Sequence, residues 1–184
     1  FLIAKTFSTQ GLSMIVPLAS YFITVAFALL LHVLVTYTVF LKFVGKVSPM
    51  LFFKKMRTAV VFAFSTASSN ATIPVTLNTV VKRLGVDKAI ASFTVPLGAT
   101  INMDGTAIMQ GVATVFIATV YAVDLSIGDY LAVILTATLA SIGTAGVPGV
   151  GLIMLTMVLT QVGLPVEGVA LIIGIDRLLD MMRT

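Results

Sequence analysis

The sequence predicts an all-α integral membrane protein that combines transmembrane helices with two oppositely oriented re-entrant helical hairpins and one broken helix. The first observation is composition, since 59% of the 184 residues are hydrophobic and only 10% are charged, against about 25% charged in soluble domains. The second is that the apolar runs are continuous and longer than the ~10-residue alternating segments of a β-barrel. The third is that polar, glycine and proline residues interrupt these runs in matching positions of two halves, which is typical of an inverted repeat.

Composition also excludes several classes of protein. Because the chain has no cysteine, it has no disulfide framework, no thiolate zinc site and no cysteine nucleophile. The single histidine, His32, leaves no histidine metal cluster, and we expect it to pack or to lie at the interface rather than to carry protons. We find no Walker motif, no Ser/His/Asp arrangement and no haem signal, so we expect neither an enzyme nor a nucleic-acid-binding protein, and no cofactor.

We expect one partial domain over residues 1–184, the core of a longer protein, because the chain begins without Met and ends inside a helical pattern. The elements that we expect, in order, are the end of a preceding helix at 1–10, a transmembrane helix at 13–45, a re-entrant hairpin at 51–81, a broken transmembrane helix at 89–123, a second re-entrant hairpin at 130–162 and a truncated last helix at 165–184.

The first helix contains an apolar run at 14–41, which exceeds the ~20 residues needed to cross a bilayer. Basic residues follow it without any acid, so the positive-inside rule places this end in the cytoplasm. A second basic loop, at 82–88, is cytoplasmic by the same rule. The segment between two cytoplasmic ends cannot cross once, and its Ser/Thr-rich middle ends at Pro74. Residues 51–81 are therefore predicted to reverse inside the membrane.

The run at 89–123 would form a helix of roughly 50 Å, longer than a ~30 Å hydrocarbon core, and we predict a break at 102–106. The acidic loop after it, with Asp124 and Asp129, is placed outside. Residues 141–151 contain four glycines and Pro148, which do not suit a straight helix. They predict a second hairpin that enters from the outer side, before the last helix.

Four ionisable residues lie within apolar runs, where a charge costs about 2.5–3.5 kcal/mol or more: Asp104, Asp176, Asp180 and Arg183. Spacings of four and three put the last three on one helix face. One reading is a structural ion pair between Asp180 and Arg183. The other is a binding site, in which Arg183 takes a carboxylate, Asp180 an ammonium and the hairpin-tip amides a second carboxylate, as an acidic amino acid would require.

An unwound stretch with Asn102 and Asp104 offers hard oxygen ligands to Na⁺ or a place for a proton relay. The alternative is a kink whose polar side chains are only hydrogen-bonded.

Four motifs in order, at residues 68–74, 96–106, 140–149 and 176–184, resemble the glutamate transporter family, the dicarboxylate/amino acid:cation symporters. The resemblance implies a homotrimer in the cell membrane, in which each full-length protomer has a scaffold and a moving transport part. It also implies secondary active symport of glutamate, aspartate or a C4-dicarboxylate with Na⁺ or H⁺, by elevator-type alternating access. This chain alone should not transport.

The resemblance implies site residues as well. The substrate-binding residues are Ala67, Ser69, Thr106, Val147, Gly151, Asp180, Arg183 and Thr184. The coupling-ion residues are Gly98, Thr100, Asn102, Asp104, Ser141, Ile142 and Thr144. Met103 would couple the two kinds of site. The family usually has an arginine at the position of Ala67 or of Met181, and a third serine at the position of Asn70 is common.

Three other readings of the sequence differ in what they predict. An ion or anion channel built from re-entrant loops would conduct without competition between substrate and ion. A carrier for neutral amino acids would not need Arg183. A structural membrane protein would show the same uptake with or without Arg183.

Overall fold

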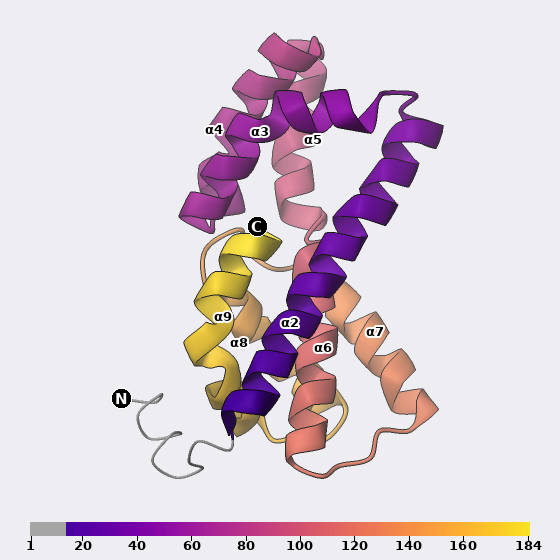
Figure 1. Ribbon diagram of the computed structural model, residues 1–184, viewed down its shortest axis with the longest axis vertical. Helices are drawn as coiled ribbons and strands as arrows, with labels where there is room; N and C mark the ends of the chain where they lie inside the picture. Colours follow the sequence, from indigo (N-terminus) through magenta and orange to yellow (C-terminus); the bar gives the residue numbers. More distant parts are fainter. Residues whose placement is uncertain (1–13) are drawn as a thin grey trace.

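The computed structural model describes residues 14–184, and all regular secondary structure in that part of the chain is helical (Figure 1). The expected helix end at residues 1–10 lies outside the described residues. The α-helices are α2 Ile15–His32, α3 Pro49–Thr66, α4 Ser69–Thr79, α5 Lys88–Ile101, α6 Asp104–Val120, α7 Ile127–Ile142, α8 Val150–Gln161 and α9 Val169–Arg183. Short π-helices continue α2 at Val33–Tyr37 and Phe40–Val44 and continue α4 at Val80–Leu84, and a 3₁₀ turn, Val166–Gly168, precedes α9.

Two helical stretches are long and apolar enough to cross a membrane: Ile15–Val44 and Lys88–Val120. The surface agrees with lipid contact, because large apolar side chains on α2 and α7 point away from the protein. Examples that are 60–64% exposed are Ile23, Phe27, Ile134, Leu135 and Leu139. A contiguous surface of this kind in a monomeric soluble protein would be unusual.

Helices α3 and α4 form a pair that turns at Ala67 and Ser68. Helix α3 begins with Pro49 at its first position, where the missing N–H costs nothing. It ends at Ala67, which adopts the left-handed conformation with φ 49° and ψ 35°. The hydroxyl of Ser68 then caps α4 by accepting from the Ala71 amide at 3.2 Å. The tip is therefore only two residues long.

Helices α7 and α8 form the second pair, with residues 143–149 between them. Helix α7 starts at a capping box, in which Ser126 Oγ accepts from the Asp129 amide and the Asp129 carboxylate accepts from the Ser126 amide. Hydrogen bonds from the Ser126 hydroxyl and amide hold the pKa of the exposed Asp129 carboxyl below its usual range. The tip of this pair is longer and glycine-rich, and Gly149 has φ 83°.

The stretch of Lys88–Val120 is interrupted where the sequence contains Asn102 and Met103. Their backbone leaves the helical region, with ψ 62° and 49° respectively. The Met103 carbonyl accepts from the amides of Thr106 and Ala107 and so begins α6. At this break the last carbonyls of α5 and the first amides of α6 lie close together, and they lack hydrogen-bond partners within their own helices.

Helix α6 lies at the centre of the lower half, where it packs against α2, α7, α8 and α9 (Figure 1). The α3–α4 pair occupies the upper half with α5, and the α7–α8 pair approaches from the opposite end. The largest completely buried side chains belong to α6, α8 and α9: Met109, Ile117, Leu155, Leu159 and Ile172. The two tips, the α5–α6 break and the end of α9 therefore meet in the middle of the molecule.

Candidate functional site

A cavity of about 90 Å³ lies where these four features meet, a volume of roughly three water molecules. All eight residues predicted to bind substrate line it: Ala67, Ser69, Thr106, Val147, Gly151, Asp180, Arg183 and Thr184. Asn102, Met103, Asp104 and Thr144, predicted for ions and coupling, line it too. The family resemblance thus indicated most of a wall that comes from five separate helices and the three connections at Ala67, 102–103 and 144–147.

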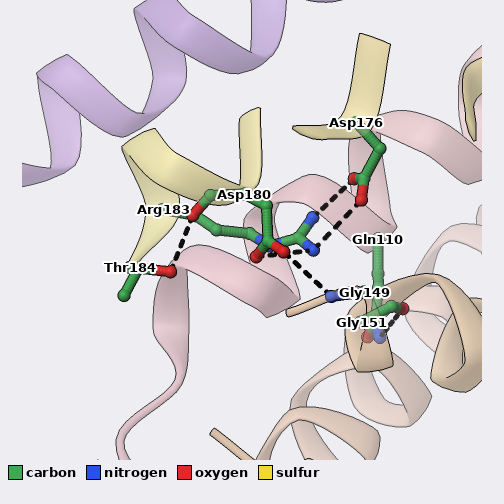
Figure 2. A network of polar contacts seen from close by, with 7 residues as sticks. All are labelled: Gln110, Gly149, Gly151, Asp176, Asp180, Arg183 and Thr184. Atoms are coloured by element: carbon green, nitrogen blue, oxygen red, sulfur yellow. Dashed lines mark hydrogen bonds and ion pairs between the residues drawn. The ribbon is translucent and has the colours of Figure 1, made fainter. Parts of the chain in front are cut away.

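The Arg183 guanidinium lies between two carboxylates of its own helix (Figure 2). Its Nη1 is 2.8 Å from Asp176 Oδ1, and its Nη2 is 3.0 Å from Asp180 Oδ1. The three side chains are 4%, 5% and 9% exposed, in the order Arg183, Asp176 and Asp180. The sequence suggested a pair of Asp180 and Arg183, and the structure adds Asp176 as a second partner, one further turn along the stripe.

One guanidinium cannot balance two ionised carboxylates, so this cluster carries a net negative charge when both acids are ionised. Burial makes that charge expensive unless a further cationic group shares it. The arrangement therefore suits a ligand that brings both signs: an ammonium for the carboxylates and a carboxylate for the guanidinium. A lone structural ion pair would need only one of the two acids.

The start of α8 is held against this cluster. The Gly149 amide donates to Asp180 Oδ2 at 2.9 Å, and the fully buried Gln110 donates from Nε2 to the Gly151 carbonyl at 3.1 Å (Figure 2). A Cβ on Gly151 would lie 2.9 Å from Arg183 Nη2. Gly151 is therefore needed for the close approach of the guanidinium to the α8 backbone. Gln110 was not predicted, because nothing in the sequence distinguishes it from other polar residues of a membrane helix.

The two helix-pair tips contact each other directly. The Gly146 carbonyl accepts from Ser68 Oγ at 2.8 Å and from the Asn70 amide at 3.0 Å. These bonds join residues that are more than 75 positions apart and close one side of the cavity. The sequence marked both tips as polar and flexible but contained no signal that they meet.

The Asp104 carboxylate forms the other polar wall. Its Oδ2 contacts His32 Nε2 and accepts from the Tyr37 hydroxyl at 3.2 Å. Tyr37 lines the cavity and was not predicted. His32, which we expected to pack or to lie at the interface, contacts the Asp104 carboxylate as well. Neither interaction follows from spacing, because both join the end of α2 to the start of α6.

Four residues predicted to bind ions through their backbone lie outside the cavity wall: Gly98, Thr100, Ser141 and Ile142. The Gly98 carbonyl accepts from the Asn102 amide at 3.0 Å, and the Ser141 carbonyl accepts from the Thr144 amide at 3.2 Å. The Ser141 carbonyl also accepts from the Gly143 amide. These four positions lie at the ends of α5 and α7, next to the cavity in sequence, and their role stays a prediction.

Comparison with known proteins gives a consistent picture. The sequence pattern of the sodium:dicarboxylate symporter family matches residues 1–184. The chain is 47% identical to an excitatory amino acid transporter of Caenorhabditis elegans over 91% of its length, covering 33% of that protein. It is 42% identical to human excitatory amino acid transporter 1 over 91% of its length, covering 31%, and 44% identical to excitatory amino acid transporter 3 of Oryctolagus cuniculus over its whole length, covering 35%. The chain spans about a third of the length of these relatives.

Proposed function

We propose a function from one premise, which is that this chain belongs to the sodium:dicarboxylate symporter family. The chain is the transport core of a secondary active symporter for an acidic amino acid or a C4-dicarboxylate. The observation that carries this proposal is the buried Arg183 between Asp176 and Asp180 in the wall of the central cavity. The names of the relatives, which are excitatory amino acid transporters, support the same substrate class.

The substrate would bind by replacing ion pairs within this cluster with ion pairs to its own charged groups. The side-chain carboxylate of the substrate would bind the Arg183 guanidinium and the Thr106 hydroxyl, and the substrate ammonium would bind the Asp180 carboxylate. The α-carboxylate would receive backbone amides from the tips, at Ser69 and near Val147. Asp176 would remain on Arg183 and keep the guanidinium oriented during the exchange. The carbonyls of Ala67 and Gly151 and the Thr184 side chain would complete the wall.

The coupling cation, Na⁺ or H⁺, would bind beside the substrate rather than with it. One Na⁺ position would use the backbone of Gly98 and Asn102, and another the side chains of Asn102 and Asp104. A further position would use carbonyls of the α5 and α7 ends: Thr100, Ser141, Ile142 and Thr144. Met103 lies between the two kinds of site in the sequence and lines the cavity. Each net positive charge that moves inward gains about 2.3 kcal/mol per 100 mV.

Transport would proceed by elevator-type alternating access in a homotrimer of the full-length protein in the cell membrane. In that scheme the α3–α4 and α7–α8 pairs are re-entrant hairpins of opposite orientation. Their approach from opposite ends of the molecule supports this reading (Figure 1). The hydrogen bonds on the Gly146 carbonyl would close the site between them.

The proposal is tested by reconstituting the full-length protein in liposomes and measuring uptake of radiolabelled aspartate. Na⁺ and pH gradients are imposed separately, at matched membrane potential. We expect saturable accumulation that depends on one of the two gradients, because the cavity binds a charged solute together with its cation. Labelled alanine serves as the neutral control. Currents without saturation or competition would indicate a channel instead, and no accumulation under any gradient would overturn the proposal.

A further inference from the structure

The Asp104 carboxylate has two partners, and both come from the same end of α2. His32 is the last residue of α2, and Tyr37 is the last residue of the π-helix that follows it. Both contact the same oxygen, Oδ2, on the first residue of α6. An ionised carboxylate only accepts hydrogen bonds, so the Tyr37 hydroxyl donates to Oδ2 and the His32 ring nitrogen would donate to the same oxygen. The pair leaves Oδ1 available to a ligand.

The π-helix Val33–Tyr37 explains how two residues five positions apart reach one atom. In an α-helix with 3.6 residues per turn, positions i and i+5 lie about 140° apart around the axis. In a π-helix the hydrogen bonds join i and i+5, so these positions lie nearly above one another. The ring centroids of His32 and Tyr37 are indeed 5.1 Å apart, in an edge-to-face arrangement. The irregular turn therefore brings both donors to one face.

The target of these donors lies at the cavity rather than in the core. The side chain of Asp104 is 30% exposed and lines the cavity, whereas that of His32 is 20% exposed. Asp104 also follows the two unwound residues and starts α6, where its negative charge is favourable. A carboxylate in the wall of a polar cavity, with one oxygen held by two hydrogen-bond donors, resembles a metal ligand whose orientation is fixed by hydrogen bonds from neighbouring residues.

We propose that His32 and Tyr37 are positioning residues that fix the Asp104 carboxylate for the coupling cation. The inference rests on the proposed function, since it takes Asp104 as a ligand of that cation. It goes further by assigning a role to one side chain of α2 and one of the π-helix that follows it, both of which would act on the cation through Asp104. Their hydrogen bonds set the direction of Oδ1, so that the cation binds without first reorienting the carboxylate.

The test uses the full-length protein in liposomes with Tyr37→Phe, His32→Gln, His32→Ala and Tyr37→Phe/His32→Ala. The Na⁺ concentration for half-maximal aspartate uptake is measured first, and the KM for aspartate is then measured at saturating Na⁺. Loss of a partner behind a metal ligand weakens metal binding by about 10- to 100-fold. We therefore expect Tyr37→Phe and His32→Ala to raise the Na⁺ requirement about tenfold, with the aspartate KM unchanged within about twofold.

His32→Gln keeps an N–H donor in nearly the same place, so we expect it to stay within about threefold of the original Na⁺ requirement. The double variant should show less than the product of the single effects, because both donors serve the same oxygen. Tyr130→Phe, at an exposed tyrosine of α7, is the matched control and should change neither quantity. If aspartate KM and Na⁺ requirement shift together, or if His32→Ala shifts neither, the positioning role is overturned.

A binding measurement separates this inference from the proposed transport. We follow the thermal midpoint of the purified protein in NaCl and in choline chloride, because a ligand that binds only the folded state raises that midpoint. The rise with NaCl should be smaller for Tyr37→Phe and His32→Ala and smallest for Asp104→Asn, because the other proposed cation positions do not use the Asp104 carboxylate. A rise that these variants leave intact would overturn the inference even if uptake is normal. A rise that they reduce, in a protein without uptake, would support it while the proposed function fails.

Discussion

Replacing Arg183 with alanine in the full-length protein is expected to lower kcat/KM for aspartate uptake by about a hundredfold. Arg183 is the cation of the buried cluster and lies beside Gly151 and Thr106 in the cavity wall. A hydrogen bond to a charged group contributes about 1.5–3 kcal/mol, and a bidentate contact with a substrate carboxylate would lose two such bonds. The measurement is the initial rate of uptake over a range of aspartate and alanine concentrations. Alanine uptake should fall less, so the preference for the acidic substrate is lost.

Two further variants separate binding from folding in this experiment. Removing Arg183 leaves Asp176 and Asp180 buried without their cation, which costs about 3–5 kcal/mol in comparable pairs. Arg183→Ala/Asp176→Asn removes one of the two acids and should restore a folded protein without restoring aspartate preference. Arg177→Ala, at an exposed arginine of the same helix, should leave uptake unchanged. Recovery of acidic preference in the double variant would show that Arg183 is only a structural partner.

Replacing Gly146 with alanine is expected to lower aspartate uptake roughly tenfold and to speed the dissociation of bound aspartate. A Cβ at Gly146 would lie 2.7 Å from Asn70 Oδ1 and 3.0 Å from the Asn70 amide nitrogen, which is backbone and cannot turn aside. The tips would have to separate, and the hydrogen bonds from Ser68 Oγ and the Asn70 amide to the Gly146 carbonyl would weaken. Overpacking of this kind costs about 1–3 kcal/mol. The measurements are initial uptake and the release rate of labelled aspartate.

The same loop offers a matched control for this prediction. A Cβ on Gly143 would meet only the Ala140 carbonyl oxygen, at 3.9 Å, and Gly143 has φ −88°, which alanine adopts readily. Gly143→Ala should therefore keep uptake and release near their original values. Asn70→Ala combined with Gly146→Ala removes the 2.7 Å contact and should recover part of the loss. Equal effects of the two glycine substitutions would contradict a role for tip contact.

The sequence predicted the features that depend on residues close together in the chain. The helix break was visible because two polar residues and a glycine interrupt an apolar run too long for one membrane crossing. It was predicted at 102–106, whereas the structure confines it to Asn102 and Met103, because α6 already begins at Asp104. The common face of Asp176, Asp180 and Arg183 followed from helical spacing, which holds in any packing environment. Both tips were marked by small polar residues, and the second also by glycine and Pro148. Pro74, which the sequence placed at the first reversal, lies inside α4. In these cases the local chemistry determines the local structure without help from the tertiary fold.

What the sequence did not predict are contacts between distant segments. The hydrogen bonds from Ser68 and Asn70 to the Gly146 carbonyl depend on how the two helix pairs pack together. The residue types in the two tips do not indicate which residues will be in contact. Asp176 as a partner of Arg183 depends on the rotamer of the guanidinium, and the Gln110 contact depends on the depth at which α8 begins. The contacts of His32 and Tyr37 with Asp104 depend likewise on how the end of α2 and its π-helical continuation meet the start of α6.

The π-helix at Val33–Tyr37 makes this part of α2 sensitive to its length as well as to its composition. Such a turn amounts to one additional residue accommodated within a continuous helix. Deleting one residue between His32 and Tyr37 would allow ordinary α geometry to return with the tyrosine four positions after His32, on the same helix face. An α-helix that kept all the intervening residues would instead turn the tyrosine about 140° away from His32 and from the Asp104 carboxylate. The stretch is therefore expected to tolerate the loss of the additional residue, but not a conversion to regular α-helix at its present length.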